Sequence, residues 1–232
     1  METDVRFRHE LKYLINKRDM DSCIARLSMF AGRDSHAGPD GYFIRSLYFD
    51  DIYHSAYEDK AGGVAKRAKY RIRMYDMDKS FISLEEKIKE GPYIRKESVR
   101  LTEDEYDKIL RGYTDFLLGR QEPAADDFSL ECRLNALRPE VIVDYDRVPF
   151  VYEHGNVRIT FDMNIRASSP GDIFEKDLPG YEVLGTDLLI MEVKYTQFLP
   201  DILRVILPDE SCRIAASKFV MCMDALRRIM VK

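Results

Sequence analysis

Basic residues recur at every second position along one stretch of this chain, and this alternation constrains the fold more than any other sequence feature. Between residues 66 and 76 the alternate positions hold four bases: Arg67, Lys69, Arg71 and Arg73. Residues two apart lie on one face of a β-strand, so the stretch predicts a strand with a basic face. Four like charges side by side repel one another and destabilise the strand unless an anion neutralises them. The pattern therefore predicts a strand that faces a bound anion.

The same alternation recurs in other stretches. We expect about eight strands, over residues 5–15, 42–50, 66–76, 80–89, 93–101, 140–152, 157–166 and 188–195. Five of them carry fixed charges on one face. A sheet with one face in water shows similar alternation, but these faces are mostly basic although the formal net charge is −5. We therefore predict an α+β fold, an antiparallel eight-stranded β-barrel with a polar bore and helices packed outside.

Helices are expected over residues 19–30, 102–112, 126–137, 198–207 and 212–231. Thr102 and Glu105 have the spacing of a capping box at the start of the second helix. The third predicted helix ends before Pro139, because proline has no backbone N–H and cannot continue a helix. Linker-like stretches between elements are short, so we predict a single domain over residues 1–232.

The composition of the chain excludes some classes of binding partner and site. The net negative charge argues against a duplex nucleic-acid binder. The four cysteines form no C-x-x-C pair and have no histidine cluster beside them, which argues against a zinc site. The first residues show no signal-peptide core, and no run of about 18 apolar residues predicts a membrane span. We expect a cytoplasmic protein with reduced thiols; no oligomeric state follows from the sequence.

A bore lined by arginine and lysine suits a chain of phosphates. Arginine offers a planar fork of donors that matches phosphate oxygens, and lysine offers a compact charge. A few carboxylates stand among the bases on the charged faces: Glu10, Glu85 and Glu192. Hard cations such as Mg²⁺ or Mn²⁺ take one or two carboxylates together with substrate phosphates. These three glutamates are therefore the predicted metal ligands.

A series of short motifs resembles one branch of the triphosphate tunnel metalloenzymes. That branch is the polyphosphate polymerase domain of the vacuolar transporter chaperone (VTC) complex and its prokaryotic relatives. The resemblance runs from about residue 5 to residue 222. It rests on eight motifs in order: Arg8-His9-Glu10-Leu11-Lys12-Tyr13, Ser46-Leu47-Tyr48-Phe49-Asp50, Lys69-Tyr70-Arg71-Ile72-Arg73-Met74-Tyr75, Leu84-Glu85-Glu86-Lys87, Val143-Asp144-Tyr145-Asp146-Arg147, Val157-Arg158-Ile159-Thr160-Phe161-Asp162, Met191-Glu192-Val193-Lys194-Tyr195 and Ala216-Ser217-Lys218-Phe219.

The resemblance implies an enzyme that transfers the γ-phosphate of ATP to a growing polyphosphate chain, with Mn²⁺ or Mg²⁺ as cofactor. Its implied phosphate contacts are Lys12, Arg71, Arg73, Lys87, Arg147, Arg158 and Lys218. Tyr145 and Ser217 would hydrogen-bond phosphates, Glu192 would hold the metal, and Lys60 is expected in a loop as a further basic contact. Three more bases on the charged faces are expected to bind phosphate: Lys69, Lys89 and Lys194.

Three departures from the family pattern stand out. Ala215 occupies a position where a further lysine is expected. Arg147 has the parity of Val141 and Val143, so either a β-bulge re-aims it or its assignment is wrong. The regulatory domain and membrane segments of the eukaryotic complex have no counterpart in this sequence, so no coupling to membrane transport is expected.

Other functions fit the same residues. A tunnel phosphohydrolase acting on tripolyphosphate or a nucleoside triphosphate would release orthophosphate and build no polymer. Arg8 stands where tunnel hydrolases tend to carry a second glutamate, which favours the polymerase branch. A non-catalytic binder of polyphosphate or inositol phosphates would turn nothing over. RNA binding is disfavoured because no aromatic–basic platform is evident, and His9 and His54 lie among aromatic residues and are interpreted as structural.

Overall fold

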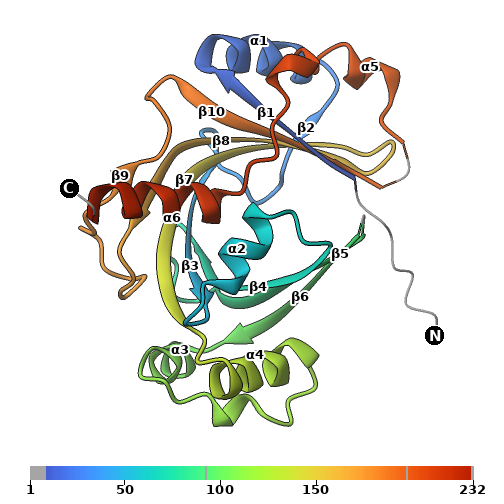
Figure 1. The fold of residues 1–232 in the computed structure, drawn as a ribbon. Helices are drawn as coiled ribbons and strands as arrows, with labels where there is room; N and C mark the ends of the chain where they lie inside the picture. Colours follow the sequence, from blue (N-terminus) through green and yellow to red (C-terminus); the bar gives the residue numbers. More distant parts are fainter. Residues whose placement is uncertain (1–8, 92, 197, 231–232) are drawn as a thin grey trace. The chain divides into compact units, whose positions relative to one another are not determined.

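The computed structural model describes residues 9–91, 93–196 and 198–230. Residues 5–8 of the first predicted strand, with Arg6 and Arg8, lie outside the described residues. Within the described ranges the chain forms an antiparallel sheet with helices (Figure 1), and the α+β class is confirmed.

The sheet has ten strands in the described part of the chain. Eight of them follow the order β1-β10-β8-β7-β3-β4-β5-β6, while β2 pairs with β7 and β9 pairs with β8. Their bounds are β1 (His9–Asn16), β2 (Gly32–Arg33), β3 (Tyr42–Asp50), β4 (Lys66–Tyr75), β5 (Ile82–Glu90), β6 (Tyr93–Leu101), β7 (Arg138–Tyr152), β8 (Val157–Ser168), β9 (Tyr181–Glu182) and β10 (Leu188–Tyr195). The eight long strands match the predicted ones closely, because alternation of residue type marks both their existence and their extent. The path ends at β1 and β6, so closure into a ring stays a prediction.

Helices connect the strands. Their bounds are α1 (Lys17–Leu27), α2 (Ser55–Ala61), α3 (Glu103–Leu110), α4 (Pro123–Leu134), α5 (Asp201–Arg204) and α6 (Lys218–Met230). The capping box is confirmed, since Thr102 and Glu105 exchange side-chain and backbone hydrogen bonds. Helix α2 was not predicted; it is short, and His54 before it gives no side-chain cap. Within the described ranges, no helix combines the length and apolarity needed to cross a bilayer.

The predicted start of the last helix at residue 212 is wrong. Helix α6 begins at Lys218, and the residues before it run along β1. The backbone N–H of Ile214 donates to the carbonyl of Lys12 at 2.9 Å, and Arg213 forms a β-bridge with Tyr13. Pairing with β1 satisfies these backbone groups, which a helix would otherwise satisfy internally.

The described residues group into two compact units. Unit 1 takes its residues from Met1–Phe43, Tyr145–Ile165 and Leu184–Ala216, and unit 2 from Ile44–Asp144, Arg166–Val183 and Ser217–Lys232. Strands β3, β7 and β8 contribute residues to both. Each unit is described by itself below, and the single domain stays a prediction.

Each unit has its own apolar core. In unit 1, α1 packs against β1 and β10 (blue and orange in Figure 1), and its Leu27 joins Phe161 and Met191 in full burial. In unit 2, α4 packs against β5 and β6, and its Phe128 belongs to a buried core that also includes Ile72 of β4. Burying each such side chain stabilises the fold by about 1.5–3 kcal/mol. The apolar faces therefore pack against helices, as the alternation predicted.

A buried ion pair that was not predicted lies in unit 2. Arg45 is almost fully buried, and its Nε and Nη2 each donate to Asp144 at 2.8 Å. Its Nη1 donates to the carbonyls of Ile173 at 3.0 Å and Glu175 at 2.6 Å. A buried charge is tolerated only when paired and hydrogen-bonded, so this pair ties β3, β7 and the segment after β8 together.

We expect Asp144→Asn to destabilise the protein by about 3–5 kcal/mol, because it leaves the Arg45 guanidinium buried without its counter-charge. Urea unfolding followed by circular dichroism measures the loss. Asp104→Asn is the matched control: its pair with Lys108 is exposed, and removing it should change stability by about 0.5 kcal/mol or less. Equal effects of the two substitutions would contradict the role given to Asp144.

Candidate functional site

Strands β1, β10 and β8 place five of the predicted site residues on one face of unit 1. In the register of β1 with β10, Lys12 lies opposite Glu192 and Glu10 lies opposite Lys194. In the register of β10 with β8, Lys194 lies opposite Arg158. Residues opposite each other on antiparallel strands share a face. The strand pairing thus brings together two carboxylates and three bases that the sequence spreads over more than 180 positions.

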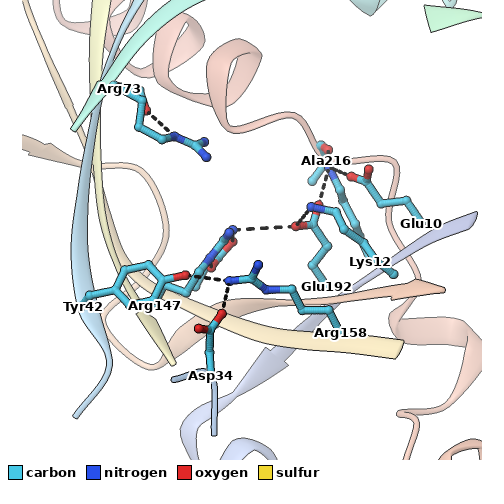
Figure 2. A network of polar contacts seen from close by, with 12 residues as sticks. Glu10, Lys12, Asp34, Tyr42, Arg73, Arg147, Arg158, Glu192 and Ala216 are labelled. Carbon is cyan, nitrogen blue, oxygen red and sulfur yellow. Dashed lines mark hydrogen bonds and ion pairs between the residues drawn. The ribbon is translucent and has the colours of Figure 1, made fainter. Parts of the chain in front are cut away.

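Lys12 lies between the two carboxylates of this face (Figure 2). Its Nζ lies 2.9 Å from Glu10 Oε1 and 3.4 Å from Glu192 Oε1, and it donates to the carbonyl oxygen of Ala216 at 2.9 Å. Burial alone would lower the pKa of Lys12, but the two carboxylates outweigh it and raise that pKa. Lys12 therefore stays protonated at every physiological pH and is a fixed positive charge.

Both carboxylate oxygens of Glu192 contact basic side chains. Oε1 faces Lys12, while Oε2 lies 2.9 Å from Lys194 Nζ and 3.7 Å from Arg147 Nη2. Its side chain is nearly buried. Glu192 is therefore the shared counter-charge of three bases.

Arg147 is held by a two-pronged ion pair. Its Nε and Nη2 donate to the two carboxylate oxygens of Asp162 at 2.6 and 2.8 Å, and its guanidinium lies 5.2 Å from the centre of the Tyr145 ring. Burial opposes the charge, but Asp162 and then Tyr145 and Glu192 keep the pKa of Arg147 well above its ordinary value. Arg147 thus joins the charged residues despite sharing parity with Val141 and Val143, and Tyr145 lies beside it. The anchoring role of Asp162 was not predicted.

Arg158 has two partners that sequence reasoning missed. Its Nη2 lies 2.7 Å from Asp34 Oδ2 and donates to the Tyr42 hydroxyl at 2.9 Å (Figure 2). Asp34 stands in an irregular segment before β3, where no periodicity points to a contact. Only the folded chain reveals this pair.

Unit 2 gathers a second cluster around Glu85 of β5. Glu85 lies opposite Arg71, whose Nε donates to Oε2 at 2.7 Å; Lys96 Nζ lies 2.7 Å from Oε1 and Arg73 Nη1 lies 3.8 Å from Oε2. Arg71 also donates to the Tyr48 hydroxyl at 2.7 Å. Burial alone would raise the pKa of Glu85, but the three bases hold it well below its usual range. Lys96 was missed, although its alternate position on β6 could have marked it.

The remaining predicted bases of unit 2 lie on β4, β5 and the nearby helices. Lys69 and Lys87 are opposite each other, and Lys87 is opposite Lys96 in turn. Lys69 Nζ donates to Ser217 Oγ at 3.2 Å and lies 4.7 Å from the centre of the Phe219 ring. Lys218 is the first residue of α6, and Lys89 lies opposite Arg67.

Lys60 does not lie in a loop, as predicted, but near the end of α2. The helix ends just after Lys60, at Ala61, with Gly62 as its C-cap. His9 stacks on Tyr195 with ring centroids 4.9 Å apart, which agrees with a structural role.

The carboxylates of unit 1 fit a metal that arrives with phosphates. Within residues 9–91, 93–196 and 198–230, no group of three or more His, Cys, Asp and Glu residues is arranged to hold a metal ion. Glu10 and Glu192 nevertheless converge on the same ammonium group of Lys12. Mg²⁺ is commonly held by one or two carboxylates plus substrate phosphates, which this pair suits. The role of Glu85 as a metal ligand stays a prediction.

Comparison with known proteins gives a family model and a set of similar folds. The model described as "VTC domain" matches residues 7–227. A comparison with curated protein sequences found no match. The solved structures that resemble this one include a protein of Vibrio parahaemolyticus described provisionally as an adenylate cyclase, and the PH1012 protein of Pyrococcus horikoshii OT3.

The likeness to these two structures lies in the fold. The Vibrio protein has a TM-score of 0.52 and 12% identity, covering 93% of this chain and 97% of its own. The Pyrococcus protein has a TM-score of 0.50 and 11% identity, covering 92% and 98%. They agree with the tunnel-type antiparallel fold predicted from the sequence.

We expect Glu85→Gln to destabilise the protein by about 3 kcal/mol at pH 7, because Arg71, Arg73 and Lys96 lose their shared anion. The pKa of Glu85 is depressed in the folded state, so its stabilisation is fully present above the unfolded value of about 4.3 and is lost as pH falls further. Urea unfolding of both proteins between pH 7 and pH 3 should therefore show the difference shrinking.

The control for this series is Glu90→Gln, on the same strand, whose pair with Lys66 is exposed. It should leave stability almost unchanged throughout. A difference between wild type and Glu85→Gln that stays constant down to pH 3 would contradict the charge assignment.

Proposed function

The chain belongs to the VTC domain family, and from that premise we propose that it is a polyphosphate polymerase that transfers the γ-phosphate of ATP to a growing polyphosphate chain. The observation that carries the proposal is the shared face of Lys12, Lys194 and Arg158 in unit 1, with two carboxylates between them. With ATP as donor, we expect a cytoplasmic enzyme.

The bases on this face suit a substrate that carries several negative charges in a row. Lys194 and Arg158 lie opposite each other on neighbouring strands, at the strand spacing of about 4.8 Å, and Lys12 lies diagonally from Lys194 on the third strand. Each base forms an ion pair with a carboxylate in this structure. Phosphate oxygens of a bound chain would replace the carboxylate in some of these contacts. Arg147 differs, because its two-pronged pair with Asp162 fixes its orientation before any substrate arrives.

Glu192 and Glu10 would hold the divalent metal, Mg²⁺ or Mn²⁺. When bound, the metal would offset charge on the phosphates during transfer, as in other phosphoryl-transfer enzymes. Lys12 contacts both carboxylates, so it would limit their repulsion and keep them close together. The proposed role of Ser217 and the unit 2 bases as further phosphate contacts rests on the family resemblance.

The reaction itself needs no covalent enzyme intermediate. A terminal phosphate oxygen of the bound chain attacks the γ-phosphorus of ATP, the bond from that phosphorus to the β–γ bridging oxygen breaks, and ADP leaves. The chain grows by one phosphate. Arg147 and Lys12 would stabilise the charge on the transferring group, because preorganised donors in a buried site act more strongly than water.

We expect purified protein incubated with ATP and Mn²⁺ or Mg²⁺ to make polymer, resolved on a gel, with ADP released in proportion. Release of orthophosphate without polymer would instead indicate a tunnel phosphohydrolase. Tight binding of polyphosphate with neither product would indicate a non-catalytic binder. Either result would contradict the polymerase.

Two substitutions should separate chemistry from binding. Glu192→Gln keeps the size but removes the charge that would hold the metal, so polymer synthesis should fall by about 100-fold or more while tripolyphosphate binding is kept. Arg158→Ala removes a charge-assisted contact and should weaken tripolyphosphate binding by about 1.5–3 kcal/mol. Calorimetric titration and the polymer assay measure the two effects.

The matched control is Glu153→Gln, an exposed glutamate of unit 1 in the turn between β7 and β8. It should change neither quantity. If Glu192→Gln abolishes binding and turnover together, Glu192 supports the fold of the site and is not the metal ligand.

A further inference from the structure

Asp34 contacts Arg158, a base proposed to bind phosphate. One of its carboxylate oxygens, Oδ2, lies 2.7 Å from Arg158 Nη2. The other, Oδ1, accepts from the backbone N–H of His36 at 3.1 Å and lies 3.1 Å from His36 Nδ1. A carboxylate on a phosphate-binding arginine occupies the donor that a phosphate oxygen would use, because both are anions with similar oxygen acceptors.

Arg158 is only partly engaged by this contact, and Arg147 shows the difference. Arg147 uses both Nε and Nη2 on the two oxygens of Asp162. Arg158 meets Asp34 through Nη2 alone, and its Nε is buried without a hydrogen-bond acceptor in the described part of the chain. A buried donor without a partner costs free energy. Asp34 therefore holds Arg158 through a single oxygen, which is an exchangeable contact, and the Tyr42 hydroxyl is the other partner of the same Nη2.

The segment that carries Asp34 is pinned to β7 at both ends. Before it, Gly32 and Arg33 pair with Val151 and Phe150. After it, Gly41 adopts φ +91°, and a Cβ there would lie 2.0 Å from the carbonyl oxygen of Arg147. Only glycine permits this approach. The two anchors keep Asp34 within reach of Arg158, so the contact is built into the fold of unit 1.

Asp34 is also ionised. Burial alone would raise the pKa of its carboxyl group, but the hydrogen bonds from His36 and the charge of Arg158 outweigh burial and lower that pKa. Asp34 thus meets Arg158 as a full negative charge at neutral pH.

We propose that Asp34 competes with substrate phosphates for Arg158 and so lowers the affinity of the site for the polyanion. This inference rests on the proposed function, in which the chain must shift by one phosphate after each transfer. A base that bound each phosphate without a competitor would slow that shift. Asp34 is then a positioning residue, because it acts through Arg158. Its ion pair with the guanidinium forms again when a phosphate dissociates, so the product chain can move along the site.

The test is calorimetric titration of tripolyphosphate into wild type, Asp34→Asn, Arg158→Ala and the double variant. Asp34→Asn should bind about 10-fold more tightly, the scale of one charge-assisted hydrogen bond. The double variant should bind no more tightly than Arg158→Ala, because the gain depends on the freed guanidinium. Stopped-flow dissociation of tripolyphosphate should slow by a similar factor in Asp34→Asn.

Asp40→Asn is the matched control, since it removes the same charge from the same segment at an exposed position. It should change affinity by less than about 2-fold, which separates local competition from general electrostatics. Asp34→Ser is a second variant; its hydroxyl can still accept from the His36 backbone, so it serves if Asp34→Asn disturbs the segment.

Unchanged or weaker binding in both Asp34 variants would overturn the inference, as it would show that Asp34 is neutral or orients Arg158 for phosphate. A gain that survives in the double variant would overturn it too. Failure of the proposed function is distinguishable: wild type would then bind no tripolyphosphate, or would bind it and make no polymer, whatever the Asp34 variants do.

Discussion

The cross-strand pairing of Lys12 with Glu192 is the contact on which the rest of the site depends. The register of β1 and β10 puts the two residues opposite each other, and the next pair along, Glu10 and Lys194, has the opposite order of charge. A shift of β1 by one residue would turn Glu10 and Lys12 to the other face, away from Glu192 and Lys194. Register therefore decides whether the bases of unit 1 gather at all, and the apolar residues between them, packed under α1, hold that register.

Both units use the same device to keep bases close together. In unit 1 the carboxylate of Glu192 lies among Lys12, Lys194 and Arg147, and in unit 2 Glu85 lies among Arg71, Arg73 and Lys96. Neighbouring like charges are unfavourable without such an anion. The buried glutamates thus let each unit fold with its bases in place.

Local patterns predicted the strands and the faces well because the period of two is a local property. The charged parity of Glu192 and Arg158 could be seen in the sequence. Contacts made by irregular segments could not, and Asp34 is the example, because nothing in its neighbours fixes where it lies. The start of α6 was missed for a related reason: Ile214 pairs with a strand about 200 residues away, which overrides local helix signals. Arg147 looked misplaced only because Val141 and Val143 precede it at the same parity.

The segment just before α6 has a consequence for the edge of the sheet. Strand β1 ends the strand path, and such an edge offers backbone groups to which another chain could add a strand. The backbone of Arg213 and Ile214 pairs with Tyr13 and Lys12 and covers part of that edge. The residues that position the Ala216 carbonyl beside Lys12 thus also protect the sheet against edge-to-edge aggregation. A truncation before residue 213 would leave the edge of β1 unpaired and would disturb the site as well.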